Sequence, residues 1–392
     1  MMTVVTGRAQ TAGGDTAVTS AAEVWPQSLA THIDSLLTSP MFTTSAVGIE
    51  IYDLTADSII YAHDNRQLLR PASTMKMITA VAALDRLGGD YLFTTRLYHT
   101  GTIDGTTLRG DLYCRGGMDP LFDDDDMTAF ASSLRDAGID TVRGNIYADL
   151  SMKDTVMQGE GWCWDDDNPC LTPLPVNGED RFMTSFADCL HRVGITVTGD
   201  MLRAVTPAGA HEICRRTHTI DSVLLTMMKD SDNLFAEALF YNLAARQGGR
   251  GAGASHGRRA VNRLITLLGL DAADYYIADG SGLSLYNYVS PHLETAFLRY
   301  AYHNSAVYRR LLTSMPVAGV DGTLAQRMRG TPAQYNVKAK TGTVTGISAL
   351  AGYCTSPNGH RLCFAVINSG IRRAAVGRAF QDRLCTAMCS IR

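Results

Sequence analysis

The chain has 392 residues, of which 45% are hydrophobic and 19% are charged, a composition typical of a globular protein with a substantial core. Its formal net charge of −4 gives no indication of nucleic-acid binding. No apolar run reaches the roughly 18 residues that a membrane-spanning helix needs, so we expect no transmembrane segment. The length predicts two or three domains.

The N-terminal residues 1–24 are rich in Thr, Ala and Gly, and we expect them to form a disordered segment. They contain no basic stretch followed by an apolar one, so no signal peptide is visible. Three alternatives stay open: the export signal has been removed, the start of the chain is misassigned, or the protein is cytoplasmic.

The nine cysteines include no C-x-x-C pair and no Cys/His spacing typical of a zinc site. We therefore interpret them as isolated buried thiols. One or two disulfides are the alternative if the protein is exported, and the odd number would leave at least one thiol unpaired in the monomer. The cysteines are Cys114, Cys163, Cys170, Cys189, Cys214, Cys354, Cys363, Cys385 and Cys389.

The first predicted elements are a short amphipathic helix over 28–38 and a β-hairpin. The hairpin consists of a strand over 46–52, which alternates with period two, and a second strand over 58–62. A helix then begins near Ser73 and ends at Gly88-Gly89. It is apolar on nearly all faces, which indicates a core helix.

The pattern changes between 93 and 205, where glycine-rich turns separate short strands and helices are expected over 127–137 and 182–192. We interpret this stretch as an inserted domain. It contains two acidic runs, Asp123–Asp126 and Asp165–Asp167, which we interpret as solvated loops rather than metal sites.

After 205 the sequence predicts a run of helices, three strands and a final helix. The loop 355–359 joins two of these strands, and its Asn358-Gly359 is a strong hairpin signal. The outer segments, 25–92 and 206–392, thus predict one domain with an antiparallel sheet and helices packed on it, an α+β fold. The predicted helices are 219–228, 234–246, 261–268, 292–303, 306–313 and 378–390, and the predicted strands are 337–344, 347–354 and 361–367.

Ser73 and Lys76 are one helical turn apart at the start of the core helix, so their side chains lie on one face within reach of each other. A serine hydroxyl is a weak nucleophile that needs an adjacent base. A lysine amine in a dry pocket loses its proton more easily and can be that base. Because S-x-x-K alone is a common surface pattern, a catalytic role for this pair needs support from other motifs.

Two further motifs come later in the chain, Ser231-Asp232-Asn233 and Lys340-Thr341-Gly342. S-x-x-K, S-D-N and K-T-G together are the motif set of penicillin-binding proteins and class A β-lactamases. Each motif alone is weak, since Ser356-Pro357-Asn358 also fits S-x-N inside a turn. The motifs are expected at a helix start, in a loop between helices and on a strand, and this order makes the set specific.

From about Val47 to the C-terminus, the chain resembles the D-alanyl-D-alanine carboxypeptidase/endopeptidases known as class C penicillin-binding proteins. The resemblance rests on the three motifs and their flanks, and it implies a β-lactamase-like serine DD-peptidase domain with an inserted α/β domain. The matching stretches are Arg70–Lys76, Gly116–Pro120, Gly161–Asp166, Ser231–Glu237, Asp279–Ser284 and Lys340–Gly346.

The resemblance implies that Ser73 attacks the D-Ala-D-Ala peptide bond of peptidoglycan stem peptides and is acylated, with neutral Lys76 as the base. Ser231, between Lys76 and the leaving amine, would relay a proton to that amine, and Asn233 would bind the substrate backbone and Lys76. The backbone N–H groups of Ser73 and Thr343 would form the oxyanion hole. β-Lactam antibiotics would acylate the enzyme as inhibitors, and the implied location is the periplasm or cell envelope.

The third motif is implied to bind the substrate's terminal carboxylate through Lys340, Thr341 and Thr343. Lys340 would also lower the pKa of Lys76 by like-charge repulsion. Gly342, which has no side chain, would let the substrate lie along the strand edge. The implied chemistry needs no cofactor, no metal and none of the ten histidines.

Two implications concern the inserted domain. Asp166 would contact the amino group of a diaminopimelate side chain in the stem peptide, the alternative being that Asp165–Asp167 only caps a turn. Family members usually carry a third domain nested within the second. The interval from Lys76 to Ser231 is too short to contain it, so we expect the third domain to be missing or reduced to a loop.

Two other functions are weighed against this hypothesis. A β-lactamase would share the acyl-enzyme but needs fast deacylation, for which class A enzymes use a Glu in an E-x-x-L-N loop that this sequence lacks. A non-catalytic module that senses peptidoglycan or penicillin would not need the intact set of motif residues. The sequence leaves the balance between carboxypeptidase and endopeptidase action, the oligomeric state and the cysteine pairing open.

Overall fold

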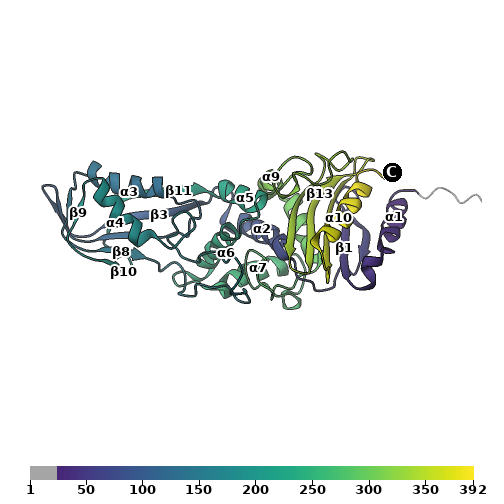
Figure 1. The fold of residues 1–392 in the computed structure, drawn as a ribbon, viewed down its shortest axis with the longest axis horizontal. Helices are drawn as coiled ribbons and strands as arrows, with labels where there is room; N and C mark the ends of the chain where they lie inside the picture. The colour runs from purple at the N-terminus through teal and green to yellow at the C-terminus, as the bar shows by residue number, and fades with distance from the viewer. Residues whose placement is uncertain (1–23) are drawn as a thin grey trace, which may run out of the picture.

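The computed structural model describes residues 24–392, so the segment predicted to be disordered, 1–24, lies outside the described residues except for Val24. The molecule is elongated, with β-sheets toward both ends and a group of helices between them (Figure 1). Within residues 24–392, no helix is both long enough and apolar enough to cross a membrane.

The C-terminal sheet has five antiparallel strands in the order β12-β13-β14-β1-β2. Its central strands β13 and β14 are buried over almost their whole length, because helices α1 and α10 contribute to the core on one face and α2 and α8 to the core on the other. β12 is an edge strand. The strands are β1 Ala46–Asp53, β2 Ser58–His63, β12 Lys338–Val344, β13 Ile347–Thr355 and β14 Arg361–Ser369; the helices are α1 Gln27–Leu37, α2 Met75–Leu87, α8 Pro291–His303 and α10 Ala374–Met388.

The central group of helices surrounds α2, in which every residue from Met75 to Leu84 is buried. This burial on all sides explains why the α2 sequence is apolar on nearly every face. α6 is also buried along most of its length and packs against α2. The other helices of the group are α5 Ile220–Lys229, α6 Asn233–Gly248, α7 Ala254–Leu267 and α9 Ser305–Ser314.

The opposite end of the molecule contains a mixed five-stranded sheet, β10-β8-β6-β3-β11, and a four-stranded sheet, β4-β5-β7-β9. Helices α3 and α4 share one hydrophobic core with these strands. The elements are β3 Leu92–His99, β4 Thr102–Asp104, β5 Thr107–Arg109, β6 Leu112–Arg115, α3 Asp124–Asp136, β7 Thr141–Val142, β8 Ile146–Asp149, α4 Phe182–Arg192, β9 Thr196–Val197, β10 Met201–Arg203 and β11 His211–Thr219.

β11 forms the edge of this mixed sheet, where it pairs with β3. The insertion predicted over 93–205 ends before this strand, and the domain boundaries stay predictions. The sequence pattern did not reveal β11 because none of its residues is buried and many are polar. β10, three residues long, was missed as well.

Most other predicted elements are present with small shifts in their ends. The helix predicted over 261–268 begins earlier, at Ala254. The acidic run Asp123–Asp126 is the capped start of α3 rather than a loop, because Asp123 accepts hydrogen bonds from the Asp125 and Asp126 backbone N–H groups.

Candidate active site

Ser73 lies in a 3₁₀ turn, Ala72–Thr74, that leads directly into α2. The preceding Ala72 has φ of +49°, the left-handed conformation that non-glycine residues adopt rarely. Two glycines allow other segments to approach this turn: a Cβ on Gly282 would lie 1.8 Å from the Ala72 carbonyl oxygen, and one on Gly342 would lie 2.6 Å from that of Pro71. The Ser73 turn is therefore held between the 279–284 loop and β12.

Lys76 is fully buried in the first turn of α2, with three oxygens around its amine. Nζ lies 3.0 Å from Ser73 Oγ, 2.7 Å from Asn233 Oδ1 and 2.8 Å from the Ser281 carbonyl oxygen. Burial lowers the pKa of Lys76 to about 8. A neutral amine has two protons and one lone pair; because the amide and the carbonyl oxygen accept the protons, the lone pair is left for the Ser73 hydroxyl.

The loop that supplies the Ser281 carbonyl is held by two buried carboxyl groups. Glu237 of α6 accepts the N–H groups of Gly280 and Ser281 at 3.1 and 2.8 Å, and burial together with the nearby Asp279 raises its pKa to about 8. Asp279 accepts hydrogen bonds from the backbone N–H groups of Gly282 and Ser284. Both residues occur in the stretches that carry the family resemblance, but sequence reasoning assigned neither a role.

Lys340 of β12 is the second fully buried lysine of the site. Its Nζ donates to Ser231 Oγ at 2.8 Å and to the Thr341 carbonyl oxygen at 2.9 Å. Burial first, and then the charge of Lys76, lowers the pKa of Lys340 well below its usual value. Burial is thus the main cause of the lowered pKa of both lysines, and the repulsion between their charges, which we expected at Lys76, contributes to the lowering at Lys340.

Ser231 and Asn233 lie where the chain passes from α5 into α6. Ser231 has φ of +64°, and Asn233 is the first residue of α6, whose N-terminus is capped by Asp232. The structure thus brings five predicted residues together through side-chain contacts, in two groups: Lys76 with Ser73 and Asn233, and Lys340 with Ser231.

The other predicted residues of the third motif come after Lys340 along the edge strand β12. Thr341 Oγ1 donates to Thr323 Oγ1 at 2.8 Å, Gly342 is buried against the Ser73 turn, and Thr343 is exposed. The outer edge of β12 is paired with residues 316–317 at Lys338 and Ala339, so the part of this edge strand after Ala339 is where an extended peptide can bind as an additional strand.

The predicted acidic residue Asp166 is exposed on the 161–167 loop, where its backbone N–H donates to the Cys163 carbonyl oxygen. A cavity of about 630 Å³ beside the Ser231–Leu234 segment is lined by Asp167 instead, together with Glu179 and Asp180. The loop is attached to the site because Trp162 Nε1 donates to Asp279 Oδ2 at 2.8 Å. The structure therefore places the neighbour of Asp166 at this cavity.

Glu294 of α8 is a further buried carboxyl group, in contact with the Ser73 turn. The Thr74 hydroxyl lies within hydrogen-bond distance of both the Glu294 carboxyl and the Pro71 carbonyl oxygen. One hydroxyl has one proton, and a carbonyl only accepts, so the contacts are satisfied when Glu294 is the protonated acid that donates to Thr74. Burial raises the pKa of Glu294 to about 8, in agreement with this geometry.

None of the described residues forms a cluster of three or more His, Cys, Asp or Glu side chains that could hold a metal ion. The two buried lysines and the half-buried Ser73 are thus the reactive groups that the site brings together. Such an arrangement can deprotonate a serine hydroxyl and bind an anionic substrate group beside it.

Comparison with known families gives a match to the D-Ala-D-Ala carboxypeptidase 3 (S13) family over residues 29–179 and 174–388. The chain belongs to this family. The predicted membership of a family of serine-type D-Ala-D-Ala carboxypeptidases and penicillin-binding proteins is confirmed. The two matched segments of this S13 protein meet at 174–179, inside the interval where the sequence predicts that the third domain is missing or reduced.

Two curated relatives are similar over most of their length. A D-alanyl-D-alanine carboxypeptidase from Actinomadura is 28% identical, with 86% of this chain and 80% of the relative covered. The D-alanyl-D-alanine carboxypeptidase DacB from Haemophilus influenzae is 26% identical, with 85% and 87% covered.

Solved structures confirm the α+β fold. The S13 chain matches penicillin-binding protein 4 from Haemophilus influenzae with a TM-score of 0.83 and 23% identity, over 90% of this chain and 98% of that one. A further structure of the Haemophilus protein contains a β-lactam and matches with a TM-score of 0.76. A predatory endopeptidase from Bdellovibrio bacteriovorus, solved with an immunity protein, matches with a TM-score of 0.57 and 20% identity, over 86% and 92% of the two chains.

Proposed function

We propose that this S13 protein is a D-Ala-D-Ala carboxypeptidase that acts on peptidoglycan stem peptides through an acyl-enzyme on Ser73. The observation that carries the proposal is the position of the Lys76 amine, 3.0 Å from Ser73 Oγ with two acceptors on its other sides. A buried amine whose pKa is lowered to about 8 is partly neutral near pH 7 and can accept the serine proton.

In the first step, Ser73 Oγ forms a bond to the carbonyl carbon of the D-Ala-D-Ala peptide, and its proton passes to Lys76. The negative charge on the carbonyl oxygen is stabilised by the backbone N–H groups of Ser73 and Thr343. The carbon–nitrogen bond then breaks, and the proton held by Lys76 passes to the leaving amine through the Ser231 hydroxyl, which accepts a hydrogen bond from Lys340 Nζ at 2.8 Å. Water later attacks the ester and releases the shortened peptide from Ser73.

Substrate binding uses the other motif residues. The terminal carboxylate of the peptide binds near Lys340, Thr341 and Thr343, and the Asn233 amide binds the peptide backbone. The peptide lies along the edge of β12 after Ala339, where Gly342 leaves room for it.

The stem-peptide side chain extends toward the acidic cavity beside Ser231, where carboxylates bind its amino group. Asp166 was the residue expected there, and the cavity lining favours Asp167 and Asp180 for the direct contacts. We place the enzyme in the periplasm or cell envelope, where this substrate is found. Endopeptidase action on cross-linked peptides is a second activity of the same site, supported by the endopeptidase from Bdellovibrio with the same fold.

The test is labelling with a fluorescent penicillin, comparing wild type with Ser73→Ala and monitoring release of the label. We expect labelling that is absent in the variant and decays over many minutes, together with D-Ala release from a D-Ala-D-Ala peptide. Release of the label within seconds would favour a β-lactamase. A folded wild-type protein that is not labelled would favour a non-catalytic binding module and contradict the proposal.

A further inference from the structure

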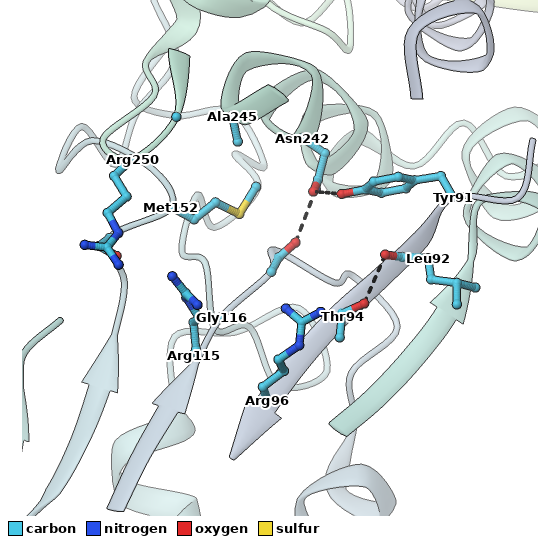
Figure 2. A pocket seen from close by; sticks show the side chains of 13 residues that line it. Tyr91, Leu92, Thr94, Arg96, Arg115, Gly116, Met152, Asn242, Ala245 and Arg250 are labelled. Atoms are coloured by element: carbon cyan, nitrogen blue, oxygen red, sulfur yellow. Dashed lines mark hydrogen bonds between the residues drawn. The ribbon is translucent and has the colours of Figure 1, made fainter. Parts of the chain in front are cut away.

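A cavity of about 450 Å³, separate from the candidate active site, lies between β3, β6 and the end of α6. Figure 2 shows it from close by, with Arg96, Arg115 and Arg250 among the residues that line it and Arg115 between the other two arginines. No acidic residue lines it, and no residue that lines it belongs to the three motifs. The cavity is therefore basic and has no part in the proposed chemistry.

The guanidinium groups of these arginines are only partly neutralised. Arg96 Nε lies 3.5 Å from a Glu212 carboxylate oxygen and Arg115 Nε lies 3.6 Å from an Asp149 carboxylate oxygen, both beyond good hydrogen-bond distance. Arg250 is exposed and has no ion pair with any residue in the described part of the chain. Most guanidinium N–H groups are thus available for a ligand.

We infer that this cavity is an anion-binding site that takes a phosphate group, held by Arg96, Arg115 and Arg250. A guanidinium binds phosphate or carboxylate oxygens with two parallel hydrogen bonds. A carboxylate has one negative charge and two oxygens, too few for three guanidinium groups. A phosphate monoester has nearly two charges and three terminal oxygens, so it can pair with all three.

The end of α6 does not prevent this binding. α6 ends at Gly248, next to the cavity, and the C-terminal end of a helix carries about half a negative elementary charge. Glu212 and Asp149 offset part of the charge of Arg96 and Arg115, but Arg250 has no carboxylate partner in the described part of the chain, and guanidinium groups stay protonated at any physiological pH. The net field in the cavity is therefore positive.

A second cavity, of about 830 Å³, adjoins the first and shares Arg96 with it. Arg215 and Arg246 line this second cavity, which also contains the carboxylate of Asp90. Glu212 neutralises part of this charge, because Arg215 Nε lies 2.5 Å from its carboxylate. The first cavity is therefore the primary site, and a ligand with more than one phosphate can extend from it toward Arg246.

The cavity lies at the opposite end of α6 from the candidate active site. α6 begins at Asn233, which contacts Lys76, and ends beside the arginines. A ligand can therefore be held here while the active site stays open. Two sources carry a phosphate monoester: the headgroup of phosphatidic acid at a membrane surface, and soluble phosphate monoesters.

The test uses inorganic pyrophosphate as the probe and measures binding by calorimetry at fixed ionic strength. The variants are Arg250→Gln, in which an exposed residue without an ion pair is changed, and Arg115→Gln/Arg250→Gln. The matched control is Arg378→Gln/Arg383→Gln, which removes the same charge from exposed positions of α10. We expect affinity to fall about tenfold for each arginine removed from the cavity and to change less than about twofold in the control.

Equal affinity in the cavity and control variants, or no pyrophosphate binding by the wild type, would overturn the inference. Penicillin labelling of every variant reports folding of the active-site region, so a failure of the proposed enzymatic function is distinguished from a failure of this site. Co-sedimentation with phosphatidic acid vesicles but not with phosphatidylcholine vesicles, lost in the double variant, would identify a lipid headgroup. Displacement of pyrophosphate by soluble glycerol phosphate, with no vesicle binding, would identify a soluble phosphate monoester.

Discussion

The candidate active site and the arginine cavity both contain basic side chains, but these side chains are buried in the first region and partly exposed in the second. Lys76 and Lys340 are fully buried, and burial lowers the pKa of both. Arg96, Arg115 and Arg250 are partly exposed around an open cavity. Burial converts an amine into a base, whereas a solvated guanidinium remains a cation.

The difference arises from the chemistry of the two side chains. A lysine amine is a point charge whose proton is lost readily in a dry site, while an arginine stays charged even there. The site that needs proton transfer contains lysines at its centre, and the cavity that we infer to bind an anion contains arginines. Each region can therefore be tested by a substitution that changes the property on which it depends: proton transfer in the active site and positive charge in the cavity.

The largest effect is expected from Lys76→Arg, which keeps a cation in place but removes the base. Because a guanidinium does not lose its proton, acylation by a fluorescent penicillin should slow by about 10²–10⁴-fold, the usual contribution of a general base. The measurement is the labelling rate at a fixed penicillin concentration.

The matched exchange in the other region is Arg250→Lys, which should keep acylation unchanged and lower pyrophosphate affinity only modestly, because a lysine still supplies charge. For Lys76→Arg, acylation at the wild-type rate would contradict the prediction, because it would show that the site requires a cation at this position and not a base.

The second effect is a pH dependence of acylation. The neutral form of Lys76 is the base, and burial lowers its pKa to about 8, so the rate should rise with pH by about tenfold per unit below this value and level off above it. A labelling rate that is flat between about pH 6 and 9 in a protein that stays folded would contradict the role of Lys76 as general base.

The candidate reactive residues could be named from the sequence because each of them belongs to a short motif in a fixed order. The structure brings Ser73, Lys76 and Asn233 together as expected, and Ser231 with Lys340. The assigned roles themselves stay predictions. The motifs identify these candidates because the spacing within S-x-x-K and S-D-N is local. The fold then has to bring only three segments together.

The supporting carboxyl groups could not be predicted in the same way. Glu237 holds a loop that lies 44 positions later in the chain, and Glu294 contacts a turn 220 positions before it. Nothing local marks these residues, because their roles depend on burial and on partners distant in sequence. Asp166 was predicted from a local motif and its role stays a prediction; its neighbour Asp167 lines the cavity beside Ser231.

A smaller effect is expected from Gly342→Ala, which would allow water to reach the buried amine of Lys76. The added Cβ would lie 2.6 Å from the Pro71 carbonyl oxygen, so β12 must move away from the Ser73 turn. Overpacking of this kind costs about 1–3 kcal/mol of stability. We expect a lower melting temperature and an acylation rate reduced by about tenfold, because a displaced β12 admits water around Lys76 and raises its pKa. Thr355→Ser at the exposed end of β13 offers a control for substitution in the sheet. An unchanged rate in Gly342→Ala would contradict the close fit.

The smallest effect is expected from Glu294→Gln. Glu294 is a buried carboxyl group that we interpret as protonated, so the substitution removes no charge. The contacts of Thr74 require Glu294 to donate a hydrogen bond, and a glutamine amide can donate to the same hydroxyl. Acylation at pH 7 should therefore stay within about threefold of wild type. Glu294→Leu removes the donor and should slow acylation more, because the Thr74 hydroxyl then loses a partner beside Ser73.

The dependence of stability on pH distinguishes a neutral acid from a carboxylate at Glu294. Burial raises its pKa to about 8 from an ordinary value of 4.5, so between these values the folded protein retains a proton that the unfolded chain has already released. Folding stability from this group is therefore fully present below pH 4.5 and is lost as pH rises toward 8. Replacement by glutamine removes this cost, so Glu294→Gln should melt at a higher temperature than wild type at about pH 7, and the advantage should vanish near pH 4. A variant that melts lower at neutral pH and loses acylation would mean that Glu294 acts as an anion.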